Sequence, residues 1–299
     1  MAASVLFAGL TTLDLVQSVE RMPSPDEKIT ALGQAISAGG PATNAAVTFS
    51  FLGGSATLLS AVGAHPLAEV ITADLAAHAV RLVDLTPGAR DAPAMSTIMV
   101  TRGTGDRAVV SVNAARHDLG PPPGLSELIS GSRAVHVDGH HPRVARAAAR
   151  LARDLGRLTV LDGGSWKPGT AELLPHIDVA VVSADFRPPG AETPEATLAF
   201  LRASGVRWAA VTRGPGPVLW QGPGEARLLP VPAVDPVDTL GAGDVFHGAL
   251  TFALPPVVTD LTEDAFAGAL GFAASVAAAS CGSFGTRSWM RAPLGSERG

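Results

Sequence analysis

Short, nearly continuous apolar segments alternate with alanine-rich segments of helical spacing along most of the chain. The apolar segments are rich in β-branched residues, which is typical of strands buried on both faces of a parallel sheet. We expect such strands at residues 4–8, 134–138, 158–162, 179–183 and 208–212, with helices between them at 143–155 and 194–204. Because parallel strands need crossover connections, the alternation predicts an α/β fold with a central, mostly parallel sheet flanked by helices.

Two other segments depart from this pattern. Residues 96–100 and 108–112 are strand-like and flank a turn that contains two glycines, which predicts a hairpin. Residues 11–35 contain strand-like pieces around two prolines. We therefore expect a small antiparallel β-sheet lid, formed by about 11–35 and 96–113, beside the main sheet. Because the sequence shows no internal repeat and no low-complexity linker, we expect residues 1–299 to form a single domain.

Composition limits the partners of the chain. Its formal net charge of −5 argues against a nucleic-acid or anionic-membrane partner. The single cysteine, Cys281, excludes a disulfide framework and a zinc ribbon. Two long uncharged runs, 29–68 and 265–286, are interrupted by glycine, proline and small residues, so we expect buried helices and strands rather than membrane spans. With no basic segment at its N-terminus, the chain is expected to be cytoplasmic.

A glycine-rich turn near residue 240 is the strongest local signal. Gly241, Ala242 and Gly243 lead into an apparent helix at about 244–252 that begins with Asp244. Backbone N–H groups at a helix N-terminus, made accessible by glycines, form a site for phosphoryl oxygens. With the ordinary pKa of an aspartate, Asp244 is almost fully ionised at neutral pH, so it can take a proton from an alcohol. The alternative is that Asp244 is only the N-cap of the helix.

A second glycine pair opens another apparent helix. Gly39 and Gly40 precede a segment that ends near residues 51–54, and Asn44 lies in its first turn. Glycines allow close approach of a ligand to the backbone, and an amide side chain both donates and accepts hydrogen bonds. Such a site suits a polyhydroxylated compound. The alternative is a common Gly-Gly helix start with Asn44 as a satisfied buried amide.

Several functional classes are excluded by missing motifs. The sequence has no P-loop motif, no dinucleotide fingerprint after a strand, no His-Glu-x-x-His and no Gly-x-Ser-x-Gly elbow. These absences argue against a Walker-type NTPase, a nicotinamide-dependent oxidoreductase, a zinc protease and a serine hydrolase. His140 and His141 are adjacent in sequence, so their rings do not easily face one metal.

Together, the segment 39–53 and the run Asp238-Thr239-x-Gly241-Ala242-Gly243-Asp244 resemble the two signatures of the PfkB (ribokinase-like) family of carbohydrate kinases. The resemblance covers essentially the whole chain. It implies a ribokinase-like fold with a β lid, and an ATP-dependent phosphorylation of a sugar or nucleoside hydroxyl that uses Mg²⁺.

The resemblance also implies roles for individual residues. Asp244 is similar to the catalytic base, and Gly241, Ala242 and Gly243 to the anion hole. The positions similar to the sugar site are Asp14, Gly39, Gly40 and Asn44. Those similar to the nucleotide site are Ser183, Thr212, Gly214, Gly216, Cys281, Gly282 and Gly285.

Within the family, the pattern resembles ketohexokinases most closely. This likeness implies that Asp26 reaches a sugar in a partner subunit and that Arg107 touches the substrate. Several positions depart from the pattern. Pro41 stands where ketohexokinases carry an Asn, and Asp185 stands one position early in place of the Glu of the family's magnesium motif. Potassium is a further implied cofactor, with the carbonyl groups around 235–237 and 280–285 as its candidate ligands.

The acceptor stays open at this point: a ketohexose, a ribose-like pentose, a 2-keto-3-deoxy sugar acid or a nucleoside. A catalytically silent sugar or nucleotide sensor on the same fold is the alternative from another class. We also expect a homodimer. The lid presents alternating apolar residues (Ile98, Val100, Val109 and Val112), and a thin sheet needs a second surface to cover its apolar face.

Overall fold

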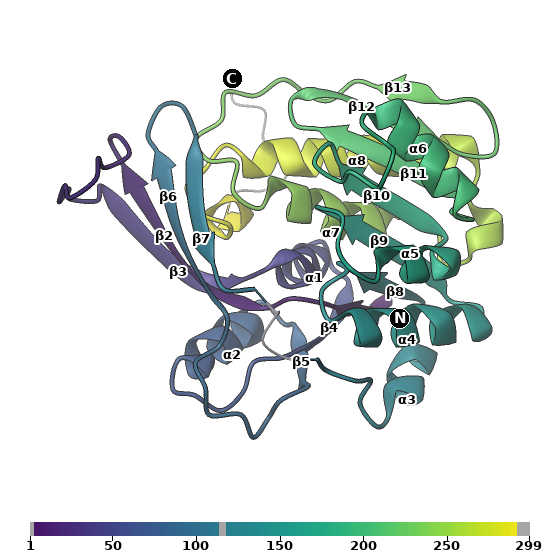
Figure 1. Ribbon diagram of the computed structural model, residues 1–299, viewed down its shortest axis with the longest axis horizontal. Helices are drawn as coiled ribbons and strands as arrows, with labels where there is room; N and C mark the ends of the chain where they lie inside the picture. Colours follow the sequence, from purple (N-terminus) through teal and green to yellow (C-terminus); the bar gives the residue numbers. More distant parts are fainter. Residues whose placement is uncertain (1–2, 114–117, 292–299) are drawn as a thin grey trace.

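The computed structural model describes residues 3–113 and 118–291, and it consists of a large sheet, two layers of helices and a smaller sheet at one side (Figure 1). In these residues the large sheet has the strand order β13-β12-β11-β10-β9-β8-β1-β4-β5. Its strands are β1 (Ser4–Ala8), β4 (Ser55–Ser60), β5 (Arg81–Asp84), β8 (Ala134–Val137), β9 (Leu158–Gly163), β10 (Val179–Ser183), β11 (Trp208–Arg213), β12 (Gly216–Gln221) and β13 (Arg227–Leu229). The seven strands β11, β10, β9, β8, β1, β4 and β5, which are neighbours in this order, pair in parallel. β12 and β13 form an antiparallel edge beside β11.

The predicted parallel strands are confirmed, each to within one residue of its expected end. Four strands of the large sheet were not expected: β4, β5, β12 and β13. β4 has a serine at each end, and β12 begins with Gly216 and Pro217, so neither shows the uninterrupted β-branched run of the inner strands. The sheet is therefore wider at both edges than the sequence pattern indicates.

Helices cover both faces of the large sheet (Figure 1). One face packs against α1 (Pro41–Phe51), α2 (Ala68–Ala77), α7 (Ala242–Ala253) and α8 (Glu263–Ser280). The other packs against α3 (Leu125–Ser130), α4 (Pro142–Asp154), α5 (Thr170–Leu173) and α6 (Pro194–Ala203). Short 3-10 helices are η2 (Leu174–His176), η3 (Val258–Asp260) and η4 (Ser288–Arg291). In the part of the chain that the structure describes, no helix has the length and apolar character needed to cross a bilayer.

The expected lid is present as a four-stranded sheet in the order β3-β2-β6-β7. Its strands are β2 (Thr12–Val19), β3 (Gly33–Gly39), β6 (Met95–Thr101) and β7 (Arg107–Ser111). The predicted hairpin is formed by β6 and β7. The lid is not wholly antiparallel, because β2 and β6 pair in parallel. The chain leaves the lid for α1, β4, α2 and β5 before β6 begins, so β6 returns in the direction of β2.

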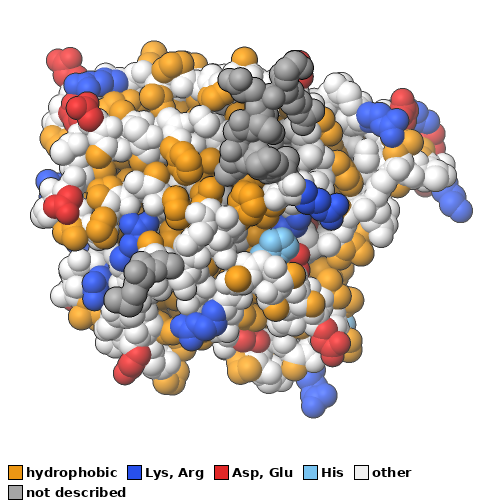
Figure 2. All heavy atoms as spheres, turned by 180° about the vertical axis from the view of Figure 1, so that it is seen from behind, with side chains coloured by type: hydrophobic (Ala, Val, Ile, Leu, Met, Phe, Trp, Pro, Cys, Tyr) orange, Lys and Arg blue, Asp and Glu red, His pale blue; other side chains and the backbone are white. Residues whose placement is uncertain are grey.

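The two faces of the lid differ. Ile98 and Val100, expected on an exposed apolar face, are only 2% and 1% exposed, because they pack with Val16 on the inner face. That part of the prediction is wrong. The strand register puts Ile36 and Val110 on the opposite face, where they are 51% and 75% exposed. Seen from behind, the projecting tip of the lid carries side chains of both charges (Figure 2).

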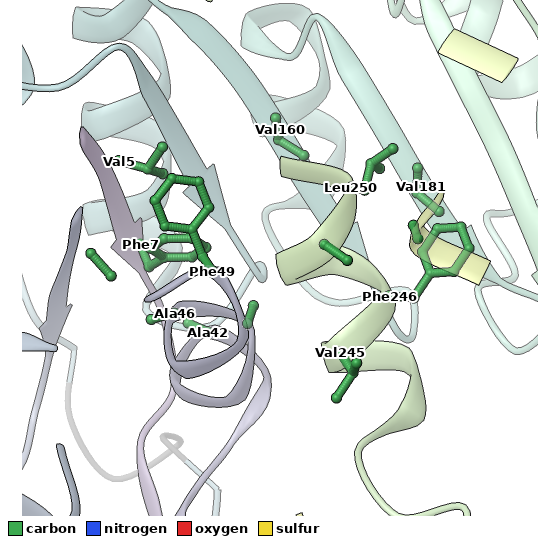
Figure 3. Packing of buried hydrophobic residues seen from close by; sticks show 14 of the residues in the cluster. Val5, Phe7, Ala42, Ala46, Phe49, Val160, Val181, Val245, Phe246 and Leu250 are labelled. Atoms are coloured by element: carbon green, nitrogen blue, oxygen red, sulfur yellow. The ribbon is translucent and has the colours of Figure 1, made fainter. Parts of the chain in front are cut away.

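The core on the α1 and α7 side brings these two helices into close contact (Figure 3). Phe7 of β1 packs edge-on against Phe49 of α1. At the helix crossing, a Cβ added to Gly248 of α7 would lie 2.4 Å from the carbonyl oxygen of Ala45 and 2.7 Å from the Cβ of Thr48. Only glycine allows this approach. The first turns of α1 and α7, which carry Asn44 and Asp244, are consequently fixed relative to each other.

We expect Gly248→Ala to lower the free energy of unfolding by about 1–3 kcal/mol, the usual cost of an added group in a packed core. The matched control is Gly268→Ala in α8, where an added Cβ meets nothing within 4 Å. Alanine favours a helix over glycine by about 1 kcal/mol, so the control should be neutral or stabilising. Urea unfolding measures both variants, and equal stability of the two would contradict the close-contact explanation.

Candidate active site

The N-terminal turns of α1 and α7 meet beside the carboxyl ends of the central strands. α7 begins at Ala242, two residues before the expected start, and its N-cap is Gly241 with φ 73°. Asp244 is thus the third residue of the helix and not its N-cap, so the N-cap alternative is wrong. The Asn44 amide Nδ2 of α1 donates a hydrogen bond of 2.8 Å to Asp244 Oδ2. The two signatures of the sequence therefore form one site.

The first turn of α7 presents backbone donors. The N–H of Ala242 donates to the carbonyl oxygen of Thr239, and that of Val245 to the carbonyl oxygen of Gly241. The N–H groups of Gly243 and Asp244 have no partner within the helix, as is usual for a first turn. The space beside Gly243 is open, since an added Cβ would meet nothing within 4 Å. This turn can bind an anion such as a phosphoryl group.

The Asp244 carboxyl is half-buried, and its electrostatic surroundings set its proton affinity. Burial is the largest cause that raises the pKa of Asp244, which is about 6. The hydrogen bond from Asn44 lowers this pKa, whereas the negative charges of Asp14 and Asp138 raise it. At pH 7 this carboxyl is mostly ionised, but less completely than an unperturbed Asp would be. A carboxylate with this pKa accepts and releases a proton readily near neutral pH.

Asp14 lies on β2 and faces the same region. Its Oδ1 accepts a 2.6 Å hydrogen bond from the Thr12 hydroxyl. Burial raises the pKa of Asp14, and hydrogen bonds from Thr12 and Ser96 oppose this shift. A Cβ on Gly39 would lie 1.9 Å from Asp14 Oδ2, so Gly39 makes room for this carboxyl. Gly40 has φ 94° and is the N-cap of α1. The two glycines thus shape the site around Asp14.

Arg107 links the lid to the glycine-rich turn. Its Nη1 donates a 2.7 Å hydrogen bond to the Thr239 hydroxyl. Next to Thr239, the buried Asp238 accepts hydrogen bonds from the N–H groups of Leu240 (2.8 Å) and Gly285 (2.9 Å). The N–H of Val237 also donates to the Cys281 carbonyl oxygen. The candidate nucleotide segment 281–285 is therefore attached directly to the α7 turn.

The remaining nucleotide candidates lie at the ends of neighbouring strands. Ser183 of β10 pairs with Thr212 of β11, and Gly214 forms the turn into β12, which begins at Gly216. Asp185, the candidate magnesium residue, is exposed in the turn after β10, where its N–H donates to the Ser183 hydroxyl. These positions share the carboxyl edge of the sheet, which is where ligands of open α/β sheets bind.

Asp26 is separate from the other candidates. It lies in the loop between β2 and β3 with φ 61°, at the far end of this hairpin from Asp14. Within the described residues, Arg21 and Glu27 form an ion pair in the same loop. The single chain therefore does not bring Asp26 to the other candidate sugar residues.

Two important residues were not assigned roles from the sequence. Asp138 is buried at the end of β8 and accepts hydrogen bonds from the N–H groups of Leu10 (2.8 Å), Ala42 (3.1 Å) and His140 (2.9 Å). It thus joins the ends of β1 and β8 to the first turn of α1. The other is Arg287, which contacts Asn44. A polar residue directly after a buried strand signals Asp138, whereas Arg287 belongs to no recognisable pattern.

One group in the described residues has side-chain atoms arranged as metal ligands: His136, Asp162 and His247, whose ligand atoms lie within 4.8 Å of one another. His247 Nε2 is 3.2 Å from Asp162 Oδ1, and His136 Nδ1 is 3.0 Å from the Thr251 hydroxyl. Burial raises the pKa of Asp162 and lowers that of His247. A neutral Asp162–His247 pair that shares one proton accounts for this contact without a metal ion.

The comparisons with known proteins agree with this geometry. The model of the pfkB family carbohydrate kinases matches residues 2–292. Ribokinase from Haemophilus influenzae is 24% identical over 96% of this chain and 95% of that protein. Ketohexokinase from Mus musculus is 22% identical over 93% of this chain and 96% of that protein. The structure of ribokinase from Giardia lamblia superimposes with a TM-score of 0.82 at 18% identity, covering 97% of this chain and 96% of that one.

The pKa of Asp244 predicts a pH profile. Because a protonated carboxyl cannot accept a proton, kcat should fall as pH decreases through about 6 and level off above pH 7. Asn44→Ala removes a hydrogen bond that lowers this pKa, so its acid limb should move to higher pH. Initial rates between pH 5 and 8.5 measure both. A flat wild-type profile in this range contradicts the assignment of Asp244 as base.

If Asp14 hydrogen-bonds a sugar hydroxyl, Asp14→Ala should raise the KM for the sugar by about tenfold or more and leave the KM for ATP nearly unchanged. The variant would leave that hydroxyl without its partner in the site, which weakens binding of the sugar alone. Asp106→Ala is the control, since Asp106 is an exposed carboxyl in the β6–β7 turn of the same lid. Steady-state kinetics with each substrate varied distinguish the two. Equal increases in both KM values would mean that Asp14 supports the fold instead.

Proposed function

Because the chain belongs to the pfkB family of carbohydrate kinases, we propose that it transfers the γ-phosphoryl group of ATP to a hydroxyl of a small, ketohexose-like sugar. The observation that carries the proposal is the placement of Asp244 in the first turn of α7, beside free backbone donors and hydrogen-bonded to Asn44. One site thus combines a base for the alcohol proton with an anion hole for the phosphoryl oxygens.

In this mechanism Asp14 and Asn44 hold the sugar so that the acceptor hydroxyl faces Asp244. The Asp244 carboxylate accepts the hydroxyl proton as the new P–O bond forms and the bond to the ADP oxygen breaks. The Gly241–Gly243 turn stabilises the charge on the transferred group. Arg107 lies beside this turn through Thr239 and supplies a positive charge from the lid.

ATP would lie along the carboxyl edge of β10 and β11, between the Ser183–Gly216 region and the segment 281–285. Mg²⁺ neutralises phosphate charge when it is bound; the exposed carboxylate of Asp185 is a hard oxygen donor that fits a water-mediated contact to it.

The segments 235–237 and 280–285, proposed to hold K⁺, lie against each other through the Val237–Cys281 hydrogen bond. We propose a cytoplasmic location, because the ATP that the reaction consumes is available there.

Pro41 limits how far the acceptor is specified. It removes the polar contact that an Asn at this position gives in ketohexokinases, while its ring suits the first position of α1. A ribose-like pentose, a 2-keto-3-deoxy sugar acid and a nucleoside are therefore the competing acceptors. ADP release measured over a panel of these compounds and of ketohexoses identifies the substrate as the one with the highest kcat/KM.

Asp244→Asn should lower kcat on the best acceptor by about a hundredfold or more and leave ATP binding intact. Asp264→Asn is a matched control, because Asp264 is an exposed acid in the first turn of α8. Coupled ADP assays give the rates, and thermal shift with ATP gives binding. Near-wild-type turnover in Asp244→Asn contradicts the mechanism, and ligand binding without any turnover in the wild type favours a sensor.

The lid supports a homodimer in this proposal. Its outer face exposes Ile36 and Val110, and pairing with a second copy across a two-fold axis would cover them. In such a dimer the loop with Asp26 lies near the partner's site, which it does not reach in its own chain.

Light scattering at micromolar concentration should therefore give a dimer, and Val110→Asp should give a monomer. Val70→Asp, which changes an exposed valine on α2, should leave the dimer intact. Asp26→Ala should raise the sugar KM in the dimer but have no added effect in the Val110→Asp monomer. A fully active wild-type monomer contradicts the proposal.

A further inference from the structure

Arg287 places a buried guanidinium group behind the catalytic carboxyl. The residue follows α8, and its side chain is only 15% exposed. Its Nη1 donates a 2.9 Å hydrogen bond to Asn44 Oδ1 and its Nη2 a 2.7 Å hydrogen bond to the Ala38 carbonyl oxygen. Nε and Nη2 also lie 3.3 Å and 3.2 Å from Asp74 Oδ2. The guanidinium is thus held on three sides and cannot turn freely.

This arrangement fixes the orientation of the Asn44 amide. A guanidinium group only donates hydrogen bonds, so the atom of Asn44 that faces Arg287 has to be the amide oxygen. The amide nitrogen then faces Asp244, where it donates the 2.8 Å hydrogen bond. With the amide turned over, two donors would face each other at Arg287 and two oxygens at Asp244. Arg287 excludes that arrangement.

Asp74 in turn anchors Arg287. It lies on α2, outside both signatures, and also accepts a 3.2 Å hydrogen bond from the N–H of Ala38. Its carboxylate compensates the positive charge that burial of Arg287 would otherwise leave unpaired. A continuous chain of hydrogen bonds therefore runs from Asp74 through Arg287 and Asn44 to Asp244.

We propose that Arg287, anchored by Asp74, is a positioning residue that locks the Asn44 amide with its N–H toward Asp244 and so keeps the catalytic base ionised and aimed at the acceptor hydroxyl. The kinetic part of this inference rests on the proposed function; the orientation of Asn44 does not.

Other charged groups around Asp244 act on the same carboxyl, and the test has to separate them from Arg287. Those that face it from the neighbouring elements are Asp14 on β2, Arg107 on β7, Asp138 at the end of β8 and Asp162 on β9. Arg287 also attracts Asp244 directly through its charge. That attraction does not need Asn44, whereas the proposed positioning does.

The experiment compares wild type, Arg287→Met, Asn44→Ala and the double variant. If Arg287 acts through Asn44, Arg287→Met lowers kcat about 10–100-fold and moves the acid limb of kcat to higher pH, with little change in the KM for ATP. In the Asn44→Ala background the same substitution then has little further effect. Arg287→Lys, which keeps the charge but not the fork of donors, recovers only part of the loss.

The control is Arg133→Met. Arg133 is another partly buried arginine, whose donors bind the carbonyl oxygens of Thr251, Phe252 and Leu254 and do not contact Asn44 or Asp244. It should lower the melting temperature without moving the acid limb. If Arg287→Met does not fold, Asp74→Asn takes its place, because it keeps the size of the side chain. It should move the acid limb in the same direction as Arg287→Met.

A measurement without turnover separates this inference from the proposed function. The Asp244 carboxyl, titrated by ¹³C NMR in aspartate-labelled protein, should ionise at higher pH in Arg287→Met or Asp74→Asn than in wild type. An unchanged midpoint overturns the proposal. An equal shift of the midpoint in Arg133→Met also overturns it. So does a full additional shift when Arg287→Met is added to Asn44→Ala, because Arg287 would then act on Asp244 by direct charge attraction alone. If no acceptor is phosphorylated but the midpoint moves as expected, the proposed function fails and the positioning of Asn44 stands.

Discussion

The close contact between α1 and α7 is the constraint on which the rest of the site depends. Gly248 lets the backbones of the two helices approach, and the aromatic packing around Phe7 and Phe49 holds α1 against the sheet. Since Asn44 and Asp244 extend from the first turns of these helices, their 2.8 Å hydrogen bond follows from this packing. The geometry of the candidate site is thus set by the hydrophobic core and not by the loops that surround it.

The site concentrates buried carboxyl groups and gives each a different environment. Burial alone opposes ionisation of all of them. For Asp138, the neighbouring His140, hydrogen bonds from backbone N–H groups and Lys167 outweigh burial and lower the pKa. For Asp244, burial outweighs the hydrogen bond from Asn44 and the pKa rises. One carboxyl therefore remains a fixed structural anion, while the other is suited to exchange a proton near neutral pH.

The inner face of the lid packs against the candidate site. Val16, Ile98 and Val100 pack there with the partly buried Leu240 and Phe284, which lie beside the α7 turn and the segment 281–285. Asp14 and Arg107 belong to the same sheet and reach toward Asp244 and Thr239. Because one small sheet carries both residues, its packing on the main domain places Asp14 and Arg107 together.

The sequence by itself determined the central parallel strands, the two glycine-rich helix starts and the identity of Asp14, Asn44 and Asp244 as candidate site residues. These features are local: a run of β-branched residues favours a buried strand, and glycines before a helix leave backbone donors accessible. The tertiary structure alone decided which face of the lid is covered, that β2 and β6 pair in parallel, and that Arg287 and Asp74 lie behind Asn44. Such contacts join residues far apart in the sequence, more than 200 positions for those of Arg287 with Asn44 and Asp74. Their energies depend on burial and on the partners that folding supplies, which no local pattern records.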